Sequence, residues 1–133
     1  MKEFRLQIVT PDGILFDGNA ESLLARSDTG DVEILAGHTD LFAALGTGRA
    51  RIKTADGVLI GSASGGFISV CSGEVKFVAT TFEFKDDIDL ERAKAAKERA
   101  EAALQNAKDD KETALIKAKL ARAVNRINVA TIK

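Results

Sequence analysis

Four arginines in the C-terminal third of the chain have a spacing that would let them bind an anion together. Arg92 and Arg99 are seven residues apart, and Arg122 and Arg126 are four apart, so each pair lies on one stripe of a helix. If the two stripes met at one seam, four like charges would repel each other unless an anion lay between them. Because planar guanidinium groups donate paired hydrogen bonds to phosphate oxygens, this spacing favours phosphate binding. The alternative is that the arginines pair with solvent or with nearby acidic residues, namely Glu91, Glu98 and Glu101.

The distribution of charge also points to an anionic partner for this part of the chain. The net charge is −1, but residues 1–84 carry 7 basic and 11 acidic side chains, whereas residues 85–133 carry 12 basic and 9 acidic. From residue 113 to residue 133 there are five basic residues and no acidic one. Such a segment attracts an acidic protein surface, a nucleotide or a nucleic acid. A solvated helix face without a partner is the plainer interpretation.

The remaining reactive side chains do not form a familiar catalytic or metal-binding pattern. Cys71 is the single cysteine and His38 the single histidine, too few for an internal disulfide or the usual kind of zinc site. His38 has no evident Ser or Cys partner, and Ala63 stands where a nucleophile elbow would need serine. The chain has no phosphate-loop motif. We therefore predict a protein that is not an enzyme and has no metal site, with Cys71 in the core of a strand.

The composition predicts a folded, soluble globular protein. Hydrophobic residues make up 45% and charged residues 29%, a globular balance, and no apolar run approaches the ~18 residues that a membrane span needs. Residues 1–10 alternate between polar and apolar and so do not form a signal peptide. We expect a cytoplasmic protein that reaches a membrane only through partners. The absence of Trp and Tyr argues against stacking platforms for nucleic acid.

The first 84 residues have the pattern of a β-structure. Phe4, Leu6 and Ile8 alternate with polar residues, which is the period of a half-buried strand. Similar alternation recurs in residues 31–34, 49–53 and 75–80. All seven Phe residues lie in this half, so it should hold the larger core. The runs are separated by turn signals, which are Asp12-Gly13, Asp17-Gly18, Thr29-Gly30, Asp56-Gly57 and Ser72-Gly73. Many short strands with regular turns predict an antiparallel sandwich or barrel over residues 1–84.

Residues 85–133 have the pattern of a helical hairpin. They contain no Gly and no Pro, and alanine is the commonest residue. Asp89 is placed to cap a helix running to about Ala107. A polar turn at residues 108–110 then leads into a second helix from about Lys111 to Val129. The short turn implies two antiparallel helices.

The second helix has two sides suited to packing. At 100° per residue, one side carries Ala114, Ala118, Ala121, Asn125 and Asn128, and another carries Ile116, Leu120, Ala123 and Ile127. The first helix gathers one small-residue face of Ala93, Ala96, Ala100, Ala103, Leu104 and Ala107. Alanine faces bury little area, so the hairpin should come away from a docked position at modest cost. A permanently docked hairpin is the alternative.

Several motifs, in order along the whole chain, give it a family resemblance. They are Val9-Thr10-Pro11-Asp12-Gly13, Gly30, Ile34-Leu35-Ala36-Gly37-His38-Thr39, Ser64-Gly65-Gly66-Phe67 and Ala121-Arg122-Ala123-Val124-Asn125-Arg126. In their order and spacing the chain resembles the epsilon subunit of bacterial F-type ATP synthases. Ala36 and Asp40 depart from the family, which often has Pro at these positions, and affect loop stiffness more than function.

The resemblance implies a fold and a role. The fold is a ten-stranded β-sandwich followed by a two-helix hairpin. The role is that of a central-stalk rotor subunit that joins the gamma subunit to the c-ring on the cytoplasmic face of the bacterial cell membrane. The hairpin is expected to inhibit ATP hydrolysis when it extends toward the beta and alpha subunits of the catalytic head. A loop role against a neighbouring subunit is implied for Gly37 and His38.

The resemblance also implies a regulatory ligand, since some bacterial members bind ATP on the folded hairpin through an Ile/Leu-Asp-x-x-Arg-Ala pattern. This chain matches it with Ile88-Asp89-Leu90-Glu91-Arg92-Ala93. The full set implied to bind ATP is Glu83, Ile88, Asp89, Arg92, Ala93, Arg99, Arg122 and Arg126. ATP would be a regulatory ligand and not a catalytic cofactor, with no assignment for magnesium.

A second set of residues is implied to inhibit hydrolysis by facing an acidic stretch of the beta subunit. It consists of Lys119, Arg122, Arg126 and Lys133, which fall on one stripe of the second helix.

Two other functions remain open on the sequence. One is a soluble ATP sensor that acts alone, which would show no affinity for stalk proteins. The other is a nucleic-acid binder that uses the basic tail, which would show a steep dependence of binding on salt. The family resemblance of the first 84 residues favours the rotor role over both.

Overall fold

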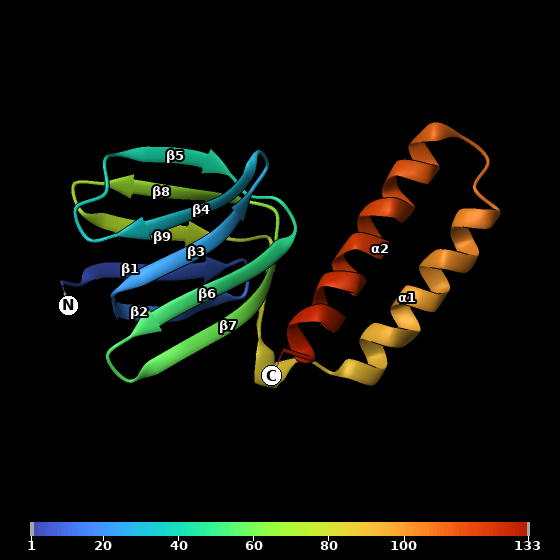
Figure 1. Ribbon diagram of the computed structural model, residues 1–133. Helices are drawn as coiled ribbons and strands as arrows, with labels where there is room; N and C mark the ends of the chain where they lie inside the picture. Colours follow the sequence, from blue (N-terminus) through green and yellow to red (C-terminus); the bar gives the residue numbers. More distant parts are fainter. Residues whose placement is uncertain (1, 133) are drawn as a thin grey trace. The chain divides into compact units, whose positions relative to one another are not determined.

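The computed structural model of the chain describes residues 2–132 and divides it into two compact units, Met1–Phe84 and Lys85–Lys133 (Figure 1). The first unit is built from strands and the second from helices.

Ten strands form the described part of the first unit, in two five-stranded sheets. One sheet has the order β2-β1-β9-β8-β5 and the other β10-β7-β6-β3-β4. All pairings are antiparallel except β1 with β9, which is parallel. The bounds are β1 Phe4–Thr10, β2 Gly13–Ala20, β3 Ser22–Ser27, β4 Gly30–Leu35, β5 Leu41–Ala44, β6 Gly48–Thr54, β7 Gly57–Ser64, β8 Phe67–Cys71, β9 Glu74–Val78 and β10 Thr81–Phe84. The predicted sandwich is thereby confirmed.

The core of the sandwich follows from the alternation of apolar residues along its strands. Leu6 and Ile8 of β1 and Ile52 of β6 are fully buried, while the residues between them face outward. Phe77 of one sheet and Phe82 of the other meet edge to face, with ring centroids 5.6 Å apart. One cluster of buried residues therefore draws on both sheets.

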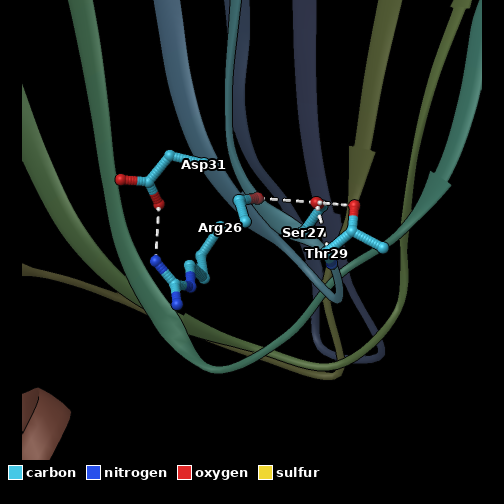
Figure 2. A network of polar contacts seen from close by, with 5 residues as sticks. Arg26, Ser27, Thr29 and Asp31 are labelled. Atoms are coloured by element: carbon cyan, nitrogen blue, oxygen red, sulfur yellow. Dashed lines mark hydrogen bonds and ion pairs between the residues drawn. The ribbon is translucent and has the colours of Figure 1, made fainter.

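The β3–β4 turn is held by a network of polar contacts (Figure 2). Ser27 donates its hydroxyl to the carbonyl oxygen of Gly30 at 2.6 Å and accepts from the backbone N–H of Thr29 at 3.3 Å. Arg26 donates to the Asp31 carboxylate at 3.3 Å across the two strands. Backbone bonds to β5 and the residues after it complete the turn, because the N–H of Asp28 donates to the carbonyl oxygen of Ala44 and the N–H of Gly46 donates to that of Arg26, each at 3.0 Å.

The second unit is a helical hairpin in which both helices start at an aspartate cap. After a short 3-10 turn, η1 (Lys85–Asp87), α1 spans Leu90–Gln105 and α2 spans Asp110–Ala130. The Asp89 carboxylate accepts from the backbone N–H of Arg92 at 3.1 Å, so the predicted cap is confirmed. Asp109 does the same for Glu112 at 2.7 Å.

Three sequence predictions about the helices need adjustment. α1 ends at Gln105 rather than near Ala107, because the Asn106 side chain donates to the Ala102 carbonyl oxygen at 3.2 Å and closes the last turn. The residues of the predicted turn also differ, since Asp109 caps α2 and Asp110 is its first residue. On one side of α2, Ile116 and Ala123 are buried and Leu120 and Ile127 are half-buried. The other side is largely exposed, at Ala114, Ala118, Ala121 and Asn128.

The prediction that Cys71 lies in the core is wrong. Cys71 is exposed, because it is the last residue of β8 and its neighbour Val70 takes the inward position. The inward positions of β8 are Ile68 and Val70, one residue out of phase with the prediction.

Gly66 offers a test of how closely the strands pack. Its φ of +90° is unfavourable for residues with a Cβ, and an added Cβ would collide with the carbonyl oxygen of Val78. We expect Gly66→Ala to lower the free energy of unfolding by about 2–5 kcal/mol, from backbone strain and overpacking together. Urea unfolding followed by circular dichroism measures this.

Gly73→Ala is the matched control. Gly73 has a similar φ of +80°, but an added Cβ would have nothing within 4 Å. Gly73→Ala should lower the free energy of unfolding by only about 1–2 kcal/mol, from backbone strain alone. Equal losses from both variants would show that the contact with Val78 is not close.

Candidate functional site

A cationic groove runs between the two helices of the hairpin. It has a volume of about 390 Å³. Its lining comes from both helices, with Ala96, Arg99, Ala100 and Ala103 from α1 and Ile116, Lys119, Arg122, Ala123 and Arg126 from α2. We call this feature the cationic groove.

Small side chains form the floor of the cationic groove. Ala100 of α1 and Ala123 of α2 are 6% and 2% exposed, so the two helices meet there. Alanine lets helix backbones approach closely, and the long side chains beside it line the groove with their charged groups toward water. The alanine-rich sequence therefore brings cations from separate helices together.

The charges in the cationic groove are all positive. Four cationic side chains line it and no carboxylate does. Within residues 2–132, Arg99, Lys119 and Arg122 take part in no ion pair. Arg122 and Arg126 are half-buried, which weakens the screening of their charges by water. An anion with several charges would relieve this repulsion, and phosphate oxygens match the donors available.

The cationic groove brings together three of the four arginines singled out in the sequence. Arg99, Arg122 and Arg126 line it, whereas Arg92 does not. Arg92 is exposed and lies about 10 Å along α1 from Arg99, given the helical rise of 1.5 Å per residue. The alternative, in which the arginines pair with nearby acidic residues, is not seen for Arg92, Arg99 or Arg122 among residues 2–132, where Glu91 forms its ion pair with Lys94 at 3.6 Å.

The other residues implied to bind ATP lie elsewhere. Ile88 and Asp89 precede α1 and Ala93 is on its first turn, buried at 2%. Asp89 uses its carboxylate to cap the helix. Glu83 is half-buried on β10, in the sandwich unit.

The structure adds one cation to the arginine set. Lys119 lines the cationic groove, although the sequence had suggested it only for the inhibitory stripe. The sequence feature that could predict this is the position of Lys119 three residues before Arg122, which places both on the same stripe of α2. Lys133, the last member of the inhibitory stripe, lies outside the described residues.

The loop of Gly37 and His38 follows β4. Gly37 takes a φ of +81°, and His38 is half-buried, with its Nδ1 2.7 Å from the carbonyl oxygen of Thr39. The Asp40 carboxylate accepts from the backbone N–H of Ser72 at 3.1 Å and so ties the loop to the β8–β9 turn. Beside this ordered loop, Phe42 is 70% exposed.

Residues 2–132 contain no cluster of three or more His, Cys, Asp or Glu that could hold a metal ion. None of the helices in the same range is long and apolar enough to span a membrane.

Comparison with known protein families covers nearly the whole chain. Residues 3–85 match the family described as ATP synthase, Delta/Epsilon chain, beta-sandwich domain. Residues 86–131 match its long alpha-helix domain. The two matched ranges follow one another in the same order as the sandwich and the hairpin.

Solved structures give the same fold. The chain superposes on a chain of the Euglena gracilis mitochondrial ATP synthase with a TM-score of 0.81 at 22% identity, covering 92% of this chain and 78% of that one. A chain of the Tetrahymena thermophila mitochondrial ATP synthase central stalk and c-ring gives 0.69 at 12% identity, covering 98% of both. At sequence identities this low, the similarity to these two structures shows a shared fold only.

Bacterial relatives are more similar in sequence. The ATP synthase epsilon chain of Bacillus velezensis is 40% identical over 130 residues, covering 98% of both chains. That of Staphylococcus aureus is 37% identical over 134 residues, covering 100% of both. With both domains matched and relatives that align along their full length, the chain belongs to the epsilon-chain family of ATP synthases.

Proposed function

We propose that this chain is a non-catalytic regulatory subunit of the central stalk of a proton-translocating F-type ATP synthase, and that its hairpin binds ATP. The observation that carries the regulatory part is the cationic groove, where four positive side chains and no carboxylate line the seam between α1 and α2. A free nucleotide would supply the missing negative charge.

The phosphates of ATP would be held by Arg99, Arg122 and Arg126. The base would lie toward the start of α1, where half-buried Ile88 offers apolar contact and Arg92 and Asp89 offer polar groups. Ala93 is buried and belongs to the proposed set through the family resemblance. The distance of about 10 Å between Arg92 and Arg99 along α1 suits an extended nucleotide rather than a single phosphate. Glu83 belongs to the same proposed set through the family resemblance.

ATP bound in this way would favour the folded hairpin. Three of the five buried apolar residues of the described hairpin are alanines, which bury little area each, and the larger two are Ile116 and Val129, so we expect opening to cost little. A ligand that binds one arrangement and not the other shifts the population toward the arrangement that it binds. In the proposal, ATP at high concentration keeps the hairpin folded and the enzyme active.

Loss of ATP would free the cations for inhibition. Lys119, Arg122 and Arg126 line one groove and belong to the stripe proposed to face an acidic surface of the beta subunit when the hairpin extends. Because the same side chains serve both uses, nucleotide and acidic surface would compete for them. We place Lys133 in this stripe on the sequence alone.

The sandwich would supply the assembly function. Its large core makes a rigid unit, and the loop of Gly37 and His38 beside exposed Phe42 is a surface for a neighbouring subunit. The proposed partners are the gamma subunit and the c-ring, with the beta and alpha subunits reached by the hairpin. The proposed location is the cytoplasmic face of the bacterial cell membrane, held through these partners.

Nucleotide binding is tested by calorimetric titration of the full chain. We expect wild type to bind ATP more tightly than AMP, since the groove contacts phosphates. Arg99→Ala should lower the affinity for ATP about tenfold or more, through loss of a charge-assisted hydrogen bond worth ~1.5–3 kcal/mol. Arg92→Ala and Asp89→Ala should also lower it, the latter partly by removing a helix cap worth ~1 kcal/mol.

Lys111→Ala is the charge-matched control, because Lys111 is exposed on α2 and does not line the groove. It should bind ATP like wild type. No heat and no rise in the melting temperature of the helices at millimolar ATP would refute the nucleotide proposal.

Inhibition is tested by replacing the stripe of Lys119, Arg122, Arg126 and Lys133 with Ala. Hydrolysis by the reconstituted complex should rise severalfold at low ATP, because the positive stripe can no longer meet an acidic surface. The difference from wild type should shrink as salt is added, since salt screens exposed charges. Unchanged hydrolysis would count against an electrostatic block.

Assembly is tested by truncation after Phe84. The fragment keeps all ten strands of the described sandwich, so we expect it to unfold cooperatively and to bind the gamma subunit in a pull-down. A fragment that is unfolded, or that folds without binding gamma, would show that the hairpin is needed for assembly.

A further inference from the structure

The row of cations in the groove extends one helical turn beyond the arginines of α2, to Lys119. α1 and α2 run antiparallel (Figure 1). Along the groove, residue numbers therefore increase on α1 while they decrease on α2. Ala96, Ala100 and Ala103 follow one another on α1, as Arg126, Arg122 and Lys119 do on α2. Among the cations of the groove, Lys119 therefore lies nearest the turn between the helices, with Ile116 lining the groove one turn beyond it.

The three cations on α2 form a row. Lys119 and Arg126 are seven residues apart, which is about 10 Å along a helix, with Arg122 between them and Arg99 contributed by α1. This length is too great for one phosphate group to contact every cation. A chain of phosphates fits the row better, because each added phosphate brings negative charge to the next cation.

The two ends of the row differ. The start of α1, where the proposed base contacts lie, is at the Arg126 end, and Lys119 is at the opposite end. Lys119 is exposed and forms no ion pair within residues 2–132. Its compact ammonium, with three donors on a flexible stem, suits the mobile last phosphate of a chain better than a fixed paired contact.

We infer that Lys119 is a specificity-determining residue of the groove, whose ammonium contacts the terminal phosphate of the bound nucleotide and so selects the triphosphate over the diphosphate. This inference rests on the proposed binding of nucleotide. It adds a residue outside the set implied by the family pattern. It also explains why a fourth cation stands beyond the three arginines.

The test is calorimetric titration of the full chain with ATP, ADP and inorganic tripolyphosphate at about 0.15 M ionic strength, where the screening length is about 8 Å. Lys119→Ala should lower affinity for ATP and tripolyphosphate about tenfold or more and leave affinity for ADP nearly unchanged. Lys119→Arg keeps the charge and should recover most of the preference for ATP. Alanine favours helix formation, so the hairpin should remain intact.

Lys117→Ala is the matched control. Lys117 is exposed on α2 and outside the groove lining, so it reports the effect of losing a charge in general, and the preference for ATP should persist. An equal loss of ATP and ADP affinity in Lys119→Ala, or no loss of either, would overturn the inference while the nucleotide site stands. If wild type binds none of the three ligands, the proposed function fails and this inference fails with it.

Discussion

The hairpin depends on a balance between close packing of alanines and repulsion among the cations that this packing brings together. Ala100 and Ala123 are nearly fully buried, so the helices approach closely enough for Arg99, Lys119 and Arg122 to line one groove. No carboxylate shares that lining. Repulsion among these cations opposes their close approach, and we propose that an anion of several charges offsets it.

The two units of the chain suit different tasks for the same physical reason. The sandwich buries large residues such as Phe77 and Leu6, and that area makes it a stable platform. The hairpin buries three alanines, Ile116 and Val129 and exposes a row of alanines on α2, so it has much less apolar core than the sandwich. We propose that the sandwich serves as the assembly platform and that the hairpin is the part that responds to ligand.

Much of this fold could be predicted from local sequence, because alternation, turn signals and the Asp89 cap act over a few residues. The parallel pairing of β1 with β9 could not, since nothing local encodes which distant strands become neighbours. The outward position of Cys71 could not be predicted either, because at the end of a strand the alternation of apolar and polar residues no longer shows which face a residue occupies. The groove was predicted only in part. Which arginines meet, and that Lys119 joins them while Arg92 does not, depends on the register between two helices and thus on where their turn begins.

A crystal structure of the full chain with ATP would test nucleotide binding in the groove most directly. We expect phosphate density between α1 and α2, with oxygens within hydrogen-bond distance of Arg99 and Arg122 and the base toward Asp89. Nucleotide bound elsewhere on the chain, with the cations of the groove turned to solvent, would contradict it.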